Sequence, residues 1–145
     1  MKLTVQVTGE AEQRLHEFHE NQVQPACHNL IRNAMIQSLQ AIITENPVET
    51  GRSRAAWVEA LQQLGGIPPA GWEGSHPTAI DDGRQKGNGT LVDGTAFTQA
   101  TASNGVDYVR YLEYGTSRIS PFAMVRRSLQ RQREQLAGMF ELQNR

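Results

Sequence analysis

The chain has 145 residues, a formal net charge of −1, 38% hydrophobic residues and 6% aromatic residues. This length suits a single core, so residues 1–145 are taken as one domain. The nearly balanced charge excludes a uniform positive field that would draw the whole molecule to nucleic acid. One cysteine, Cys27, excludes an internal disulfide, and the start MKLTVQVTGE has no apolar region typical of a secretory signal. No apolar run approaches the roughly 20 residues of a membrane span, so we expect a soluble protein of the reducing cytoplasm, without a membrane partner.

Charge is distributed unevenly along the chain. Residues 1–50 carry three basic and six acidic side chains, residues 51–109 carry four and six, and residues 110–145 carry seven and three. An acidic body with a basic C-terminal end predicts head-to-tail contact between copies or docking onto an acidic neighbour. Ordinary scatter of surface charge is the alternative.

The N-terminal part predicts a short strand followed by a long helix. Residues 3–7, LTVQV, alternate apolar and polar side chains as a half-buried strand does. From Ala11 an amphipathic pattern predicts helix to about Thr44, with Pro25 as a kink or as the first residue of a second helix. The Asn-Pro pair at 46–47 is expected to end it.

The middle of the chain predicts a short helix and then a long loop. Thr50 can cap a helix that carries Ala55, Trp57 and Leu61 on its apolar side. Residues 65–90 are rich in glycine and proline and lack helix or strand periodicity, which predicts a flexible loop.

The last third predicts a strand and a short helix. Residues 95–103 are rich in threonine and suit a strand, and the Asn-Gly pair at 104–105 is a strong turn signal. Residues 106–114, VDYVRYLEY, could return as a strand or form a short helix. The helix is favoured because Tyr108 and Tyr111 share a face at helical spacing.

A basic helix is predicted to complete the chain. Gly115 is placed to end the short helix in a left-handed conformation. Ser120 is then expected to be the N-cap of the last helix, with Pro121 at its first position and its end near Leu142.

Histidines and glycines do not form a convincing chemical site. His16 and His19 lie three residues apart on the predicted helix, which suits two zinc ligands, but no third ligand follows at metal-site spacing. Cys27 and His28 are adjacent on a helix and do not face each other. Asp81 and Asp82 beside the glycines at 83–89 do not alternate as in a calcium loop, and no Lys-Ser/Thr pair follows these glycines as in a phosphate loop. We therefore predict no catalytic residue, no metal, no cofactor and no enzymatic activity.

Arginines gather near the C-terminus without an acid between them: Arg118, Arg126, Arg127, Arg131 and Arg133. At about 100° per residue, Arg127 and Arg131 lie on the back of the predicted helix, whereas Arg126 and Arg133 flank its apolar stripe. These arginines do not form one stripe that enters a DNA groove, and we expect the flanking Arg126 and Arg133 to cover the edge of the core or pair with acids of another subunit. A small DNA-binding regulator stays an alternative.

Residues 108–127, YVRYLEYGTSRISPFAMVRR, hold all three tyrosines beside a Gly-Thr-Ser loop. The segment contains no nucleophile–base pair and no metal-ligand spacing, and its aromatic and arginine residues are typical of a surface that packs against a partner. Trp72 in the glycine-rich loop is predicted to be a further contact. The candidate interface residues are Tyr108, Tyr111, Glu113, Tyr114, Gly115, Thr116, Arg118, Arg126 and Trp72.

Two motifs in this order resemble a family of minor structural proteins of tailed bacteriophages, called tail-completion, head–tail joining or neck proteins. The first is TGRSRAAW at 50–57 and the second is the tyrosine segment with the proline-opened helix after it. The matching residues are Thr50, Gly51, Arg54, Tyr108, Tyr111, Glu113, Tyr114, Gly115, Thr116, Pro121, Phe122 and Arg126.

The resemblance implies an α+β subunit in which a small, mostly antiparallel sheet is flanked by a long N-terminal helix and a C-terminal helix. It leaves room for a strand that begins near Trp57. It also implies a ring of copies, commonly a hexamer, at the junction of head connector and tail in a virion assembled in the host cytoplasm. Expected partners are the head-connector or adaptor protein and the tail-tube or tail-terminator protein, with non-specific contact to DNA in the channel. A tail terminator or another minor tail protein is the nearest alternative.

Overall fold

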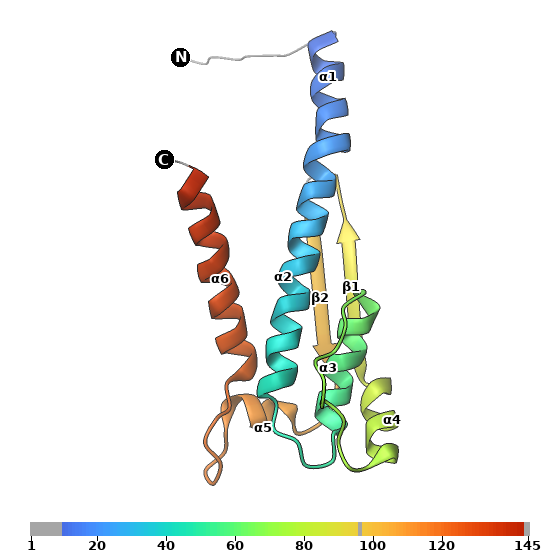
Figure 1. The fold of residues 1–145 in the computed structure, drawn as a ribbon, viewed down its shortest axis with the longest axis vertical. Coiled ribbons are helices and arrows are strands. Elements are labelled where there is room, and N and C mark those ends of the chain that lie inside the picture. Colours follow the sequence, from blue (N-terminus) through green and yellow to red (C-terminus); the bar gives the residue numbers. More distant parts are fainter. Residues whose placement is uncertain (1–9, 96, 144–145) are drawn as a thin grey trace, which may run out of the picture.

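The structure is a computed structural model that describes residues 10–95 and 97–143. The strand predicted at residues 3–7 lies outside this part of the chain. Within it the fold is α+β: a two-stranded antiparallel sheet accompanies a long N-terminal helical rod and a C-terminal helix (Figure 1). No helix of the described ranges is both long and apolar enough to cross a membrane.

The N-terminal rod consists of α1 (Glu10–Phe18), a π-helical turn η1 (His19–Val23) and α2 (Gln24–Glu45). Pro25 lies in the first turn of α2. Proline lacks an N–H and its ring crowds the carbonyl four residues earlier, so the wider π-helical turn before it lets the rod continue. The prediction of a long helix with an irregularity near Pro25 is thus confirmed, and α2 ends immediately before the Asn-Pro pair.

Helix α3 (Arg52–Gln63) packs against the lower half of α2 and supplies much of the core. Gly51 is its N-cap with a φ of 89°, and Thr50 Oγ1 accepts a hydrogen bond from Arg52 N at 3.4 Å beside it. The alternative of a strand near Trp57 is wrong, because Trp57 is buried inside this helix. The core cluster comprises Leu39, Ile42, Ile43, Ala55, Trp57, Val58, Ala60, Leu61, Leu64, Trp72 and Met124.

The prediction of a flexible loop over 65–90 is wrong for its second half. Helix α4 (Pro77–Gln85) and strand β1 (Gly87–Asp93) begin there, and the irregular stretch before α4 runs from Gly65 to His76. The glycines allow α4 and β1 to lie directly on the α3 backbone, since a Cβ at Gly83, Gly87 or Gly89 would come within 2.0–2.2 Å of an α3 carbonyl oxygen. We call this contact the glycine seam. Its carbonyls come from successive turns of α3: Arg52, Ala56 and Ala60.

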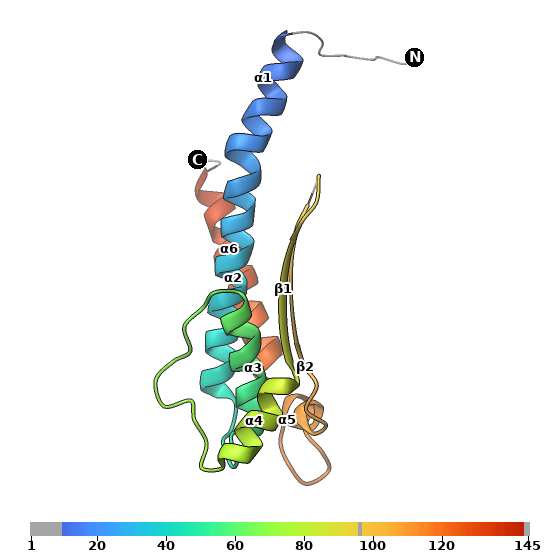
Figure 2. The ribbon, with the colours of Figure 1, turned by 90° about the vertical axis from the view of Figure 1, so that its right-hand side faces the viewer.

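Strand β1 pairs with β2 (Thr98–Asn104) in a hairpin, with Gly87 opposite Asn104 and Asp93 opposite Thr98. The Gly94 N–H donates to Phe97 O at 2.7 Å and closes its turn. The predicted strand at 95–103 is therefore largely confirmed. The Asn-Gly pair does not close a hairpin but ends β2 and leads into the next helix. The sheet lies on one side of the layer formed by α2 and α3 (Figure 2).

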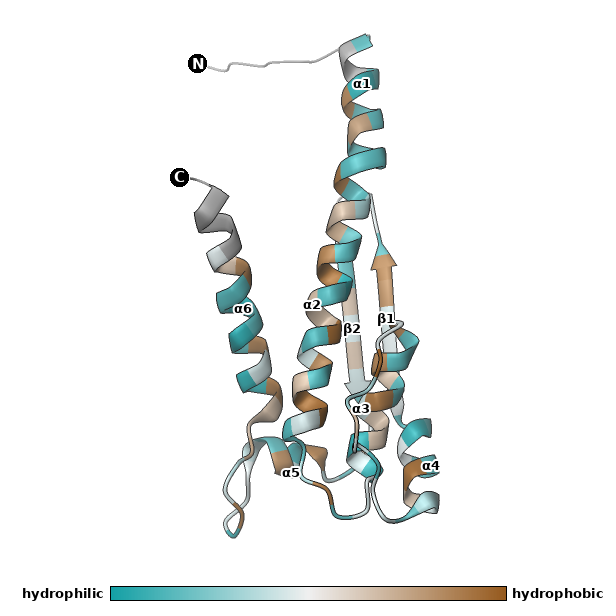
Figure 3. Ribbon diagram, viewed as in Figure 1, coloured by the Kyte–Doolittle hydropathy of each residue, from teal (hydrophilic) through white to brown (hydrophobic). Residues whose placement is uncertain are grey.

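The chain ends with α5 (Val109–Tyr114) and α6 (Met124–Gln143). The short helix was predicted, but α6 begins three residues later than expected, after Ala123 with a φ of 50°. Helix α6 runs back along α2, where the buried Ser128 hydroxyl donates to Ser38 O at 2.9 Å. Brown apolar residues recur along α2 and α3, whereas much of the coloured ribbon of α1 and α6 is teal, the colour of hydrophilic residues (Figure 3).

Candidate functional site

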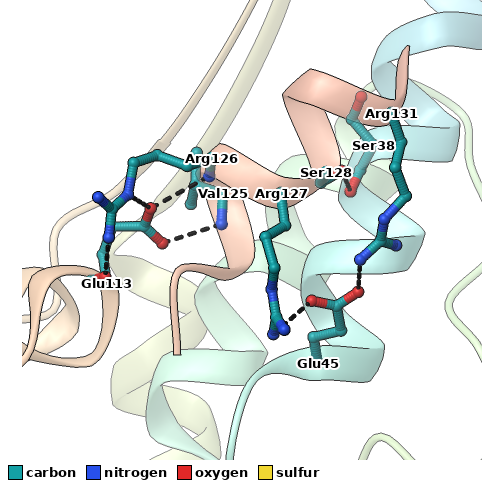
Figure 4. Close-up of polar contacts among 8 residues, drawn as sticks. All are labelled: Ser38, Glu45, Glu113, Val125, Arg126, Arg127, Ser128 and Arg131. Atoms are coloured by element: carbon teal, nitrogen blue, oxygen red, sulfur yellow. Dashed lines mark hydrogen bonds and ion pairs between the residues drawn. The ribbon is translucent and has the colours of Figure 1, made fainter. Parts of the chain in front are cut away.

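Glu113 joins α5 to the start of α6. Its side chain is buried, with 6% of the residue exposed. Its carboxylate accepts hydrogen bonds from Val125 N at 2.9 Å and from Arg126 N at 3.1 Å (Figure 4). A carboxylate at this position satisfies free N–H groups of the first turn and complements the helix dipole. Glu113 therefore caps α6 in place of the predicted Ser120.

Arg126 completes the same junction. Its Nε donates to Glu113 Oε1 at 3.0 Å, and its Nη2 donates to Glu113 O at 2.9 Å. The guanidinium carbon also lies 5.0 Å from the ring centroid of Tyr114, in cation–π range. Arg126, predicted as a partner contact, is thus held within its own chain and fixes the ring of Tyr114.

The Gly115–Thr116 turn supports the loop that follows. Gly115 has a φ of 77° and a ψ of −178°, so the predicted positive φ is present, but the backbone is extended rather than left-handed helical. The Thr116 N–H donates to Ile119 O at 2.8 Å, and its Oγ1 accepts from Arg118 N at 3.2 Å and from Ile119 N at 3.1 Å. These bonds close the loop and present Arg118 and Ile119 at its exposed end.

The exposed side chains around this junction form one candidate surface. Tyr114 is 67% exposed, Ile119 50% and Tyr111 47%, and Arg118 is also exposed. We call these four residues the tyrosine edge. Arg110 stacks over the ring of Tyr111 at 4.9 Å and donates to its hydroxyl at 3.0 Å. The sequence interpretation missed Arg110, although its place beside Tyr111 was a usable signal.

Two of the predicted interface residues lie elsewhere in the packing. Tyr108 is half-buried at the N-cap of α5. Trp72 is 8% exposed and belongs to the core, with the guanidinium of Arg84 5.5 Å from its ring centroid. The prediction that Trp72 contacts a partner from a flexible loop is wrong, because the ring packs inside the fold.

The basic face of α6 is partly neutralised within the chain. Glu45, the last residue of α2, lies between Arg127 and Arg131, with Arg127 Nη2 2.9 Å from Glu45 Oε2 and Arg131 paired to Oε1 (Figure 4). Arg127 and Arg131, which the sequence placed on the back of the helix, therefore pair with α2. Among the described side chains, no carboxylate pairs with Arg118.

The motif at 50–57 has a structural role. Arg54 donates to Asn46 O from Nε at 3.0 Å and from Nη2 at 2.7 Å, which fixes the turn after α2, and burial lowers the pKa of Arg54. Arg52 forms a hydrogen-bonded ion pair with Asp82 on α4. This bond raises the pKa of Arg52 and lowers that of Asp82, with a smaller lowering from Lys86.

Two of the four histidines, His16 and His28, pair with acids. His16 Nε2 lies 3.2 Å from Glu20, and His28 Nδ1 lies 2.5 Å from Asp93 Oδ2, which links α2 to the hairpin tip. Hydrogen bonds from His28 and then Thr98 lower the pKa of Asp93. Within the described part of the chain, no three His, Cys, Asp or Glu side chains are grouped to hold a metal ion.

Comparison with protein families, curated proteins and solved structures gave no match. A proposal for the function therefore rests on two observations. One is the geometry of the tyrosine edge, and the other is the residue pattern in the sequence that indicated it.

Proposed function

We propose that this protein is a non-enzymatic structural subunit of a tailed-phage virion, which assembles into a ring that joins the head connector to the tail. The observation that carries the proposal is the tyrosine edge. Tyr111, Tyr114 and Arg118 are exposed, while Glu113 and Thr116 hold the backbone beneath them through hydrogen bonds that are internal to the chain.

Exposed side chains on a backbone that is held by internal hydrogen bonds suit a binding surface. Tyrosine and arginine are the residue types that contribute most to protein–protein affinity, and side chains fixed before binding lose less entropy when the complex forms. Stacking by Arg110 and Arg126 restrains the two tyrosine rings in the free protein. The tyrosine edge is therefore prepared for a protein partner rather than for a small substrate.

We propose a ring for two reasons. The two sequence motifs resemble those of the phage neck proteins, and one molecule presents different surfaces that can meet in a contact between copies. A heterologous contact, in which one surface meets a different surface of the next copy, closes into a ring when the rotation between copies is fixed. We propose a hexamer that meets the connector or adaptor protein on one side and the tail-tube or terminator protein on the other. Contact with DNA would be non-specific and confined to the channel, and the site of action is the virion.

The experiment is the mass of the purified protein in solution, followed by negative-stain imaging of any large species. Rings, or a monomer that forms rings when a connector or tail protein is added, are the expected result. Rings that bind only the tail tube would instead indicate a tail terminator. A strict monomer or dimer that ignores these partners and binds DNA with steep salt dependence would replace the proposal with a DNA-binding regulator.

A further inference from the structure

The upper end of the N-terminal rod projects from the rest of the fold. Every side chain from Gln13 to Val23 is exposed, and Figure 1 shows α1 standing beyond the end of α6. We call residues 13–23 the arm. A helix of this length is only marginally stable in water without packing, so the arm is expected to gain stability from a partner.

The arm carries an apolar row on one side. Leu15 is 57% exposed, Phe18 59% and Val23 37%. In a regular α-helix, Val23 would lie about 80° around the axis from Leu15 and about 140° from Phe18. The π-helical turn η1 takes about one residue more than an α-helical turn, which brings Val23 back between the other two. The π-helical turn therefore aligns three large apolar side chains at the surface.

The same side of the rod packs against a helix further down. Leu30 lies seven residues after Val23, which is close to two helical turns. It lines a small pocket between α2 and α6 together with Ala34 and with Leu136 of α6. Helix α6 thus covers the lower part of this side, and the arm leaves the upper part free for a second helix.

Helix α6 has a groove on the side that faces away from α2. Ser128 marks the inner side, because its hydroxyl bonds to Ser38 of α2. Arg126, Arg133 and Ala137 lie about 140–180° around the helix from Ser128. We call this surface the α6 groove, and it is lined by Arg126, Leu129, Gln130, Arg133, Glu134 and Ala137. Leu129, which is 51% exposed, lies between the two arginines in sequence.

The arm and the α6 groove match each other in length and charge. The apolar row from Leu15 to Val23 is about 12 Å long and the groove from Arg126 to Ala137 about 16 Å, at about 1.5 Å per residue. Residues 10–23 hold four glutamates and one arginine, whereas residues 110–145 carry seven basic and three acidic side chains. Contact between two arms would bring like charges together, while an arm in the groove brings opposite charges together.

The arm of the same chain does not reach this groove. It continues the axis of α2, and the groove faces away from α2. The helix that enters the groove therefore comes from another molecule.

We propose that the arm of one copy packs into the α6 groove of the next copy. This inference rests on the proposed function and names a contact that links copies of the ring. An amphipathic helix binds a groove through apolar anchors spaced about three and seven residues apart, which is the pattern that the π-helical turn restores. Arg126 lines the groove and also stacks on the ring of Tyr114, so the bound arm lies beside the tyrosine edge.

The test uses three full-length double variants. The arm variant is Leu15→Gln, Phe18→Gln, which removes two apolar anchors with a residue that favours helix. The groove variant is Leu129→Gln, Arg133→Glu. The control, Gln13→Ala, Asn21→Ala, changes the opposite side of the arm. All the changed side chains are exposed, so circular dichroism should show the wild-type helix content in each.

Ring formation is then measured by analytical ultracentrifugation. We expect the arm variant and the groove variant to remain monomers under conditions in which the wild type and the control form rings. The arm variant keeps an intact groove and the groove variant keeps an intact arm. Their equimolar mixture should therefore give a species of twice the 16.1 kDa monomer mass and nothing larger.

Three results would overturn the contact between arm and groove. They are full-size rings from the arm variant alone, a mixture that stays monomeric, and a groove variant that dimerises by itself through its arms. If the wild type forms rings in any of these cases, the ring itself stands. A 1:1 species from the mixture without any wild-type ring would support the contact and contradict the proposed function.

Discussion

The glycine seam and the tyrosine edge use their residues in opposite ways. In the seam, Gly83, Gly87 and Gly89 bring α4 and β1 onto α3, and every contact is internal to the chain. At the edge, internal contacts by Glu113 and Arg126 serve to hold other side chains at the surface. Stability is therefore expected to depend on the seam, and association on the edge. Substitutions should separate these two properties.

The largest loss of stability is expected from Gly87→Ala. The added Cβ would lie 2.0 Å from Ala56 O, so the strand or the helix has to move. We expect the free energy of unfolding to fall by about 3 kcal/mol, as for overpacked cores, in urea denaturation. Gly138→Ala is the control, since a Cβ there meets nothing within 4 Å in α6. It should raise stability by about 0.5–1 kcal/mol. Equal urea midpoints for Gly87→Ala and wild type would show that the seam is not close-packed.

A smaller loss is expected from Glu113→Ala. This change leaves the N–H groups of Val125 and Arg126 without their buried acceptor, which costs about 2 kcal/mol. Glu134→Ala removes an exposed carboxylate of α6 that accepts only from Gln130 among the described contacts. Its effect should stay within about 0.5 kcal/mol. Thermal unfolding of both variants is the measurement, and equal melting temperatures for the two would rule out the capping role of Glu113.

A weaker effect than the two above is expected from the ion pair of Arg52 and Asp82, which lies beside the seam and makes stability depend on pH. The bond from Arg52 lowers the pKa of Asp82 in the folded chain, so Asp82 stabilises the fold above its ordinary pKa of about 3.9. This contribution is lost as the pH falls through the lowered value. Asp82→Asn should therefore reduce stability at neutral pH and flatten its loss in acid, measured as urea midpoints from about pH 7 to about pH 3. Parallel curves for variant and wild type would contradict this.

Local patterns predicted the elements whose causes are local. The rod, its end at the Asn-Pro pair and the short helix α5 follow from apolar spacing and from the geometry of proline. The start of α6 could not be read in this way, because its cap is Glu113, which lies twelve residues before Val125 in sequence. A Ser-Pro pair at 120–121 gave a stronger local signal than the distant carboxylate.

Glycine misled the interpretation of residues 65–90. The same residue marks both turns and close approaches of backbone to backbone, and sequence alone does not distinguish them. For the site, sequence correctly grouped the residues of the α5–α6 junction but assigned all of them one role. Only the fold separates the exposed Tyr111, Tyr114 and Arg118 from the supporting Glu113 and Arg126.

We propose that the tyrosine edge links this protein to its neighbours in a ring, and the mass of an edge variant tests this link. The mass distribution of the double variant Tyr114→Ala, Arg118→Glu is compared with that of the wild type and of Asp81→Arg, a charge reversal on the exposed surface of α4. All three should unfold within about 0.5 kcal/mol of one another, because the changed side chains are exposed. We expect rings from the wild type and from Asp81→Arg, alone or with connector or tail protein, and none from the double variant. Rings of undiminished yield from the double variant would contradict it.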